Sequence, residues 1–224
     1  YTTDRWKAYC GEVAGQATIS QQTFVLGQTD VPNNPKYFVR FQQTANGSTY
    51  NPIFYQRIEG VQNFAGGKVT TSIWLKVASG TLTVTPLIRQ KFGTGGSPSA
   101  DVITTGANYT VTTTWTKFTT TFTIPSISGK TLGSDNNNGL DLAFSLPTGA
   151  TFTLDIAQVQ LCAGDVALPF MPKSFEEELR ACQRYCYQVG SDNIYTVYAL
   201  GLNESSTVSS GVISFGTTFE NAFP

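Results

Sequence analysis

The sequence has 224 residues, of which 14 are Lys or Arg and 15 are Asp or Glu, so its formal charge is −1. This balance lacks the basic surface typical of nucleic-acid-binding proteins, and no apolar run is long enough to form a membrane-spanning helix. The absence of histidine also excludes most catalytic triads and most metal-dependent chemistry. We therefore expect no nucleic-acid partner and no membrane insertion.

Short strand-like segments alternate with turn signals through the first 170 residues. Their apolar residues recur at period two, and they are rich in threonine, which suits a pleated strand. This pattern predicts an all-β sandwich without alternating helices. The predicted strands cover residues 17–25, 37–41, 53–58, 69–77, 82–90, 115–124, 140–146 and 151–161.

Three prolines interrupt this pattern. Pro86 lies within the segment 82–90 and predicts an edge strand or a bulge, because proline has no amide hydrogen for a sheet ladder. Pro169 and Pro172 are expected to end the last strand of the sandwich and to form a stiff connector. We therefore expect two domains, residues 1–171 and residues 172–224.

A short helix is predicted directly after this connector. Ser174 is suited to the N-cap position, and Glu177, three residues later, completes a capping box. The helix is expected to carry one apolar stripe, formed by Phe175, Leu179, Cys182 and Cys186. The strands predicted beyond it, at 185–189, 194–200 and 211–215, are too few to close a sheet. We expect this second β module to be completed by another chain or by further residues of a longer polypeptide.

Two loops carry residues with potential chemistry. The glycine-rich run 92–99 lacks the lysine of a Walker loop and no helix follows it, so we interpret it as a loop between strands. Asp135 and Asp141 flank three asparagines whose oxygens would suit calcium, although such residues are also typical of a polar turn. These two aspartates and Glu59 do not identify a pair of catalytic carboxylates. We expect no enzymatic activity and no resident cofactor, and a structural calcium ion at the aspartates and asparagines is the alternative to a polar turn.

Aromatic side chains are the remaining candidates for ligand binding. Trp74 lies between Ile73 and Leu75 in a predicted strand, so we expect it in the core. Trp115 falls on the strand face opposite its apolar neighbours, and we expect Trp115 and Tyr109 to form an exposed platform on which a sugar ring stacks. A further tryptophan, at position 6, is expected to anchor an N-terminal strand.

Several segments together resemble a group of tailed-phage virion proteins described as tail-fibre or receptor-binding proteins. The order and spacing of these segments cover nearly the whole chain. Two positions depart from the group: Cys162 occurs where an acidic residue is expected, and Met171 where a Phe-Glu pair is common. The matching segments are Asp4-Arg5-Trp6, Gln56-Arg57-Ile58-Glu59, Ser72-Ile73-Trp74-Leu75-Lys76, Phe92-Gly93-Thr94-Gly95-Gly96-Ser97-Pro98-Ser99, Thr121-Phe122-Thr123-Ile124-Pro125, Phe152-Thr153-Leu154-Asp155-Ile156-Ala157-Gln158-Val159-Gln160-Leu161 and Glu178-Leu179-Arg180-Ala181-Cys182-Gln183-Arg184-Tyr185.

The resemblance implies a jelly-roll sandwich similar to a carbohydrate-binding module, followed by a small β domain. It also implies a non-enzymatic virion protein that is assembled in the host cytoplasm, forms a homotrimer, contacts other virion proteins and adheres to host-surface glycans. The resemblance transfers no catalytic residue and does not define the receptor contacts. Two alternatives stay open: a structural virion adaptor or decoration protein that binds no glycan, and a secreted carbohydrate-binding module.

The four cysteines are too few to form a disulfide scaffold for a chain of this length. Cys182 and Cys186 are four residues apart on the predicted helix, a spacing that would also suit two metal ligands. Since histidine is absent and phages assemble in a reducing cytoplasm, we expect free thiols within the apolar stripe. Cys10 and Cys162 form a disulfide only if their strands are neighbours, and the sequence leaves this open.

Overall fold

The computed structural model describes residues 6–9, 17–44, 51–183, 200–203 and 209–212. The chain divides into two compact units, Tyr1–Phe170 and Met171–Pro224. The first unit contains the sandwich, and the second contains a short helix and a pair of strands.

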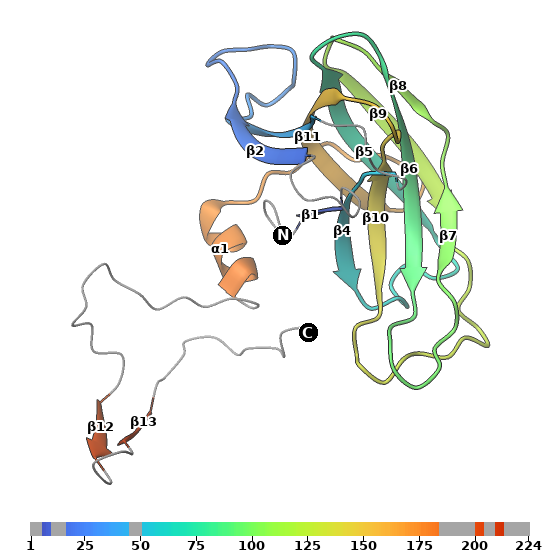
Figure 1. Ribbon diagram of the computed structural model, residues 1–224, viewed down its shortest axis with the longest axis vertical. Coiled ribbons are helices and arrows are strands. Elements are labelled where there is room, and N and C mark those ends of the chain that lie inside the picture. The colour runs from blue at the N-terminus through green and yellow to red at the C-terminus, as the bar shows by residue number, and fades with distance from the viewer. Residues whose placement is uncertain (1–5, 10–16, 45–50, 184–199, 204–208, 213–224) are drawn as a thin grey trace. The chain divides into compact units, whose positions relative to one another are not determined.

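The first unit is a jelly-roll β-sandwich of two antiparallel sheets, as predicted (Figure 1). Each of the eight segments predicted for the sandwich contains a strand, β1 is the N-terminal strand expected at Trp6, and β7 and β8 are additional. One sheet has six strands in the order β1-β4-β10-β6-β7, with β8 pairing to β6; the bounds are β1 (Trp6–Tyr9), β4 (Ile53–Glu59), β10 (Gly139–Ser145), β6 (Leu82–Lys91), β7 (Val102–Thr105) and β8 (Tyr109–Val111). The other has five strands in the order β2-β3-β11-β5-β9; the bounds are β2 (Ala17–Thr23), β3 (Tyr37–Gln43), β11 (Phe152–Ala163), β5 (Lys68–Val77) and β9 (Thr116–Thr123).

The core fills the space between the two sheets. Because strand side chains alternate between faces, every second residue of β5 and β10 faces inward and is buried. Complete burial of one of these large apolar side chains contributes roughly 1.5–3 kcal/mol. Trp6 stacks on Phe54 with ring centroids 4.5 Å apart, so it anchors β1 as expected. The largest fully buried aromatic residues are Phe41, Phe54, Phe92, Phe122 and Phe144.

Pro86 marks neither an edge strand nor a bulge, contrary to the expectation from the sequence. β6 is an interior strand, and its register with β10 continues without a shift past Pro86. On its other side, β8 pairs with residues 82–84 and β7 pairs with residues 87–90. The Pro86 carbonyl accepts the Gly106 N–H on this side at 2.9 Å. The missing amide hydrogen therefore faces the gap between β8 and β7, where no ladder partner requires it.

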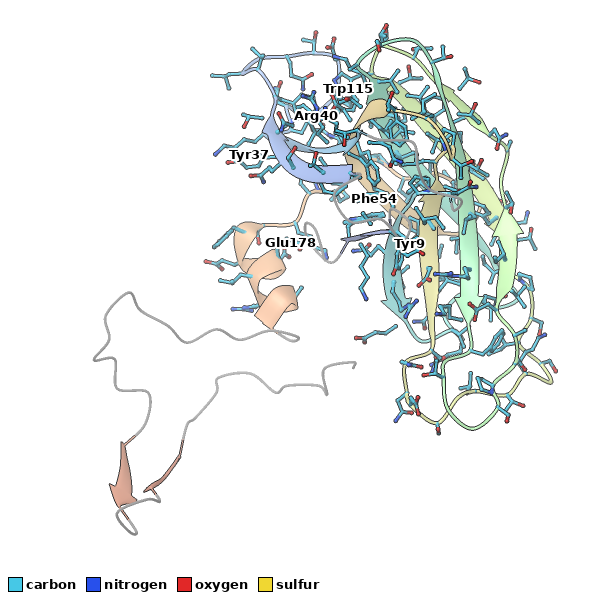
Figure 2. All side chains as sticks on the ribbon, viewed as in Figure 1. Tyr9, Tyr37, Arg40, Phe54, Trp115 and Glu178 are labelled. Atoms are coloured by element: carbon cyan, nitrogen blue, oxygen red, sulfur yellow. The ribbon has the colours of Figure 1, made fainter. Side chains whose placement is uncertain are left out.

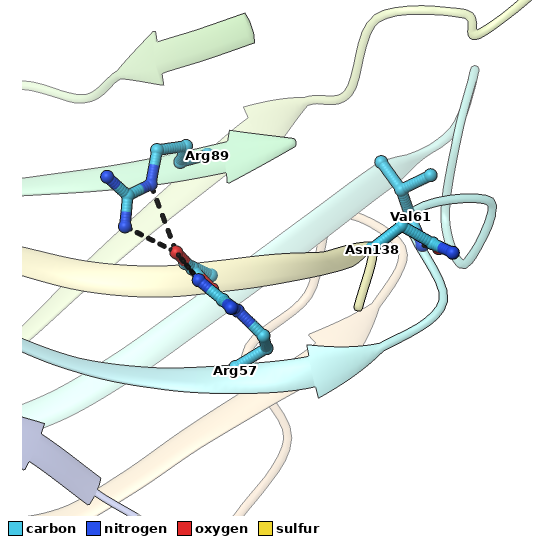
Figure 3. Close-up of polar contacts among 5 residues, drawn as sticks. Arg57, Val61, Arg89 and Asn138 are labelled. Atoms are coloured by element: carbon cyan, nitrogen blue, oxygen red, sulfur yellow. Dashed lines mark hydrogen bonds and ion pairs between the residues drawn. The ribbon is translucent and has the colours of Figure 1, made fainter. Parts of the chain in front are cut away.

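An ionic cluster occupies the middle of the outer face of the six-stranded sheet (Figure 3). Asp141 on β10 lies directly opposite Arg57 on β4 and Arg89 on β6. Arg57 binds both carboxylate oxygens, with Nε 2.7 Å from Oδ1, and Arg89 binds Oδ2 through Nε at 3.0 Å and Nη2 at 2.6 Å. The hydrogen bonds to Asp141 raise the pKa of Arg57. Asp141 is fully buried beneath the two guanidinium groups, and its ion pairs connect β10 to β4 and to β6.

The glycine-rich run forms a loop after β6 and packs against residues 133–138. The Thr94 hydroxyl donates to Asp135 at 2.7 Å, and the Thr94 amide donates to the Asn137 side-chain oxygen at 2.8 Å. Asn138 likewise accepts the Val61 amide at 2.9 Å (Figure 3). In the part of the chain that the structure describes, no group of three His, Cys, Asp or Glu side chains is placed to hold a metal ion. The hydrogen bonds of Asp135, Asn137 and Asn138 are those of a polar turn that joins this loop to its neighbours.

The second unit begins with helix α1 (Phe175–Gln183), whose capping box is formed as predicted. The Glu177 amide donates to Ser174 Oγ at 3.3 Å, and the Ser174 amide donates to Glu177 Oε2 at 2.8 Å. The bond from the Ser174 amide is the main cause of the lowered pKa of Glu177. None of the helices among the described residues has the length and apolar character needed to cross a membrane. β12 (Leu200–Asn203) pairs antiparallel with β13 (Ser209–Val212).

Cys162 is a buried, free thiol, and its sulfur accepts a hydrogen bond from Gln160 Nε2 at 3.1 Å. Cys10, Cys186 and the side chain of Cys182 lie outside the described residues, as do the predicted strand 185–189 and most of the strand predicted at 194–200.

Candidate functional site

A hollow of about 310 Å³ lies on the outer face of the five-stranded sheet. We call it the Trp74 hollow. Its floor consists of the side chains of Ser72 and Trp74 on β5 and Lys117 on β9. One wall is the loop between β2 and β3, and the other is the segment that follows β11.

Trp74 faces this hollow and is partly exposed, which corrects the expectation that it belongs to the core. Its neighbours Ile73 and Leu75 are both buried between the sheets, so strand alternation turns Trp74 to the opposite face. In the sheet register, Trp74 lies between Ala157 on β11 and Lys117 on β9. The indole packs against the apolar cluster that contains Ala157, and Lys117 places a cation on the other side.

The β2–β3 loop forms the first wall, and two side-chain amides fix it: Gln28 closes a turn within the loop, and Gln158 joins the loop to the sheet. Gln28 Nε2 donates to the Val31 carbonyl at 2.8 Å, and the Val31 amide donates back to Gln28 Oε1 at 2.9 Å. Gln158 Nε2 on β11 donates to the Pro32 carbonyl at 2.7 Å. Asn33, which lines the hollow, has a positive φ of 67°, a conformation that asparagine tolerates better than most residues.

The second wall consists of Ala167, Pro169 and Phe170. The start of this segment is fixed to β5 by two hydrogen bonds of Gly164. Its amide donates to the Lys68 carbonyl at 2.8 Å, and its carbonyl accepts the Thr70 hydroxyl at 2.9 Å. The walls therefore belong to segments more than a hundred residues apart that reach the same face of one sheet.

Trp115 lies on the outer face of the five-stranded sheet, as strand alternation predicts, but it is buried (Figure 2). Trp115 is covered by Phe24 and Val31 of the β2–β3 loop and by Phe38 on β3. The ring centroid of Trp115 lies 5.3 Å from that of Phe24 and 5.5 Å from that of Phe38. The expectation of an exposed Trp115 platform is therefore wrong. Trp115 supports the loop that walls the Trp74 hollow.

Tyr109 is also buried, and it faces the core of the sandwich. Its ring stacks on Phe118 with centroids 4.7 Å apart, and its hydroxyl forms a 2.7 Å hydrogen bond with Thr120. Burial raises the pKa of Tyr109. The expectation of exposure at this residue is wrong as well, because β8 pairs with β6 and directs Tyr109 inward.

Comparisons with known proteins find solved structures that are similar to this chain at low sequence identity. No protein-family model matches the chain, and no curated protein matches it. A CBM4 carbohydrate-binding module is 18% identical with a TM-score of 0.45, over 72% of this chain and 88% of that one. A CBM22 xylan-binding domain from Paenibacillus barcinonensis is 14% identical with a TM-score of 0.47, over 74% of this chain and 90% of that one. The enzymatically active domain of bacteriophage CBA120 tailspike protein 4 is 14% identical with a TM-score of 0.47, over 71% of this chain but only 19% of that one.

Proposed function

We propose that this chain is a non-catalytic glycan-binding protein and that the Trp74 hollow is its binding site. The observation that supports this proposal most strongly is a partly exposed indole on the floor of a hollow framed by polar groups. The face of an aromatic ring is apolar and suits the C–H face of a sugar ring. The Ser72 hydroxyl, the Asn33 amide and the Lys117 ammonium surround it and provide the few polar groups that orient a ligand.

The size of the hollow favours a short stretch of glycan. At about 310 Å³ it lies at the small end of ligand sites, which span roughly 300–1,000 Å³. A site of this size makes few contacts, so we expect weak binding at each copy. Several copies on one particle would multiply this weak affinity through their effective concentration.

We further propose that the protein is a virion appendage that adheres to host-surface glycans. The support for this setting is the set of sequence segments that resemble tailed-phage receptor-binding proteins, together with a surface of low charge. The proposed site and the sandwich fold would suit a secreted carbohydrate-binding module equally well. Antibody labelling of purified phage particles distinguishes the two settings, because only the virion protein co-purifies with particles.

Replacement of Trp74 by alanine is expected to weaken glycan binding at least about tenfold, which corresponds to roughly 1.4 kcal/mol. The measurement is a glycan array followed by titration of the best-binding glycan with the parent protein and the variant. Trp74→Tyr keeps an aromatic face and is expected to retain most of the affinity. Tyr9→Ala serves as the matched control, because Tyr9 is an exposed aromatic on the other sheet (Figure 2). Equal binding by Trp74→Ala and the parent would reject the site, and release of reducing ends from the glycan would reject the non-catalytic assignment.

Self-association is expected through the second unit. Phe175 and Leu179 occupy one face of α1 and are 79% and 43% exposed, an unusual position for side chains of this kind. We expect copies of the chain to cover this face in a homotrimer. Sedimentation velocity should give a trimer for the parent and a smaller species for Phe175→Ser/Leu179→Ser. A parent protein that remains monomeric at micromolar concentration would contradict this expectation.

A further inference from the structure

The outer face of the five-stranded sheet carries mostly positive charge. Its five strands contain four cations and one carboxylate, although the whole chain has a formal charge of −1. Strand alternation places all five on the outer face, because the inner face is the apolar core. They are Arg40, Lys68, Lys76, Lys117 and Asp155.

Two carboxylates on this side of the sandwich, Asp155 and Asp165, are paired with cations other than Lys117, whereas Asp30 in the β2–β3 loop forms no ion pair with a described residue. Asp155 binds Arg40 with both oxygens, at 2.7 Å from Nε and 2.8 Å from Nη2 (Arg40 is labelled in Figure 2). Asp165, in the segment after β11, lies 3.7 Å from the Lys68 ammonium. Among the residues that the structure describes, no carboxylate forms an ion pair with Lys117, and none lines the Trp74 hollow.

Lys117 is therefore an exposed cation at the position where a charged sugar substituent would lie. It is directly opposite Trp74 in the sheet register, and the Cβ atoms of such pairs are about 4.5–5.5 Å apart. A pyranose ring stacked on the indole would bring its ring substituents within reach of the flexible lysine side chain. A carboxylate or sulfate there would accept a charge-assisted hydrogen bond from the Lys117 ammonium, and this bond is stronger than the one that a neutral hydroxyl would accept.

We propose that the Trp74 hollow selects an anionic glycan, with the sugar ring on Trp74 and its carboxylate or sulfate at the Lys117 ammonium. This inference rests on the proposed glycan-binding function and deepens it by naming the class of sugar. It predicts that Trp74 supplies affinity for the ring, whereas Lys117 supplies the preference for negative charge.

The test uses the full-length protein on an array that presents neutral glycans beside their uronate-bearing and sulfated counterparts. The strongest binding is expected on the charged members. Raising the NaCl concentration from about 0.05 M to about 0.5 M should weaken the binding of charged members and leave neutral members nearly unchanged, because salt screens an exposed ion pair. The separate uronate and sulfate members identify which anion the hollow accepts.

Lys117→Gln is the decisive variant. It is expected to reduce affinity for charged glycans by about fivefold, the effect of losing one partly exposed ion pair, and to remove the salt dependence. Lys91→Gln is the matched control, since Lys91 is on β6 of the other sheet and is expected to have no effect. Binding of neutral and charged members with equal affinity, or an undiminished preference for charge in Lys117→Gln, would overturn the inference and leave the proposed function standing. Absence of binding to every glycan on the array would overturn both.

Discussion

Replacement of Asp141 by alanine is expected to lower the free energy of unfolding of the sandwich by about 3–5 kcal/mol. The loss arises because Arg57 and Arg89 would remain on the sheet without the buried carboxylate that both now bind. Their side chains are only 26% and 28% exposed, so water replaces the lost hydrogen bonds poorly. Urea unfolding followed by circular dichroism measures the difference.

Two variants test whether the loss of unfolding free energy comes from the unpaired arginines or from any substitution in the sandwich. Asp165→Ala removes the carboxylate of an exposed pair with Lys68, in which the side chains are 65% and 55% exposed, and is expected to cost less than about 1 kcal/mol. Simultaneous replacement of Arg57, Asp141 and Arg89 by Leu, Leu and Met removes the whole cluster and is expected to be much less harmful than Asp141→Ala alone. A loss below about 1 kcal/mol for Asp141→Ala would show that the cluster does not stabilise the sandwich.

Trp115→Ala is expected to destabilise the protein by about 3 kcal/mol and to weaken glycan binding as well. Both effects have one cause, because Trp115 packs against Phe24 and Val31 of the loop that walls the Trp74 hollow. Removing the indole leaves a cavity beneath this loop and loosens the wall. The measurements are urea unfolding and titration with the best-binding glycan, at a temperature where the variant is folded.

Trp115→Phe is the matched control, since a smaller aromatic ring fills part of the same space and should preserve most of both properties. The pair of measurements also distinguishes support of the loop from direct contact with the glycan. If Trp115→Ala abolished binding while the free energy of unfolding stayed unchanged, Trp115 would be a ligand platform after all.

Strand alternation predicted the sandwich and the outer-face position of Trp115, but the expectations of a core Trp74 and of an exposed Trp115 and Tyr109 were wrong. Trp115 and Trp74 both occupy the outer face of the five-stranded sheet. The β2–β3 loop buries Trp115 but leaves Trp74 partly exposed, and this depends on the packing of Val31 and on the hydrogen bond between Gln158 and Pro32. The residue pattern within one strand does not show which of its side chains a loop from another part of the chain will bury. The alternation of Ile73 and Leu75 did contain the signal that Trp74 faces outward.

The ion pairs could not be predicted from the sequence either, because each joins residues that are far apart in the chain. Asp141 was visible only as an aspartate near a polar turn, because its partner Arg57 lies 84 residues away in the chain. Asp155 and Arg40 are separated by 115 residues and become neighbours only when β11 pairs with β3. By contrast, the capping box of Ser174 and Glu177 was predicted correctly, since both partners lie within one helical turn.

The most direct test of the proposed site is an NMR titration that follows the indole N–H signals of the three tryptophans. Trp6 stacks on Phe54, Trp115 is covered by the β2–β3 loop, and only Trp74 lines the hollow. With the glycan that binds best on the array, the Trp74 signal is expected to shift progressively to saturation, while the Trp6 signal stays in place. Saturating binding that leaves the Trp74 signal unmoved would contradict the assignment of the Trp74 hollow as the glycan site.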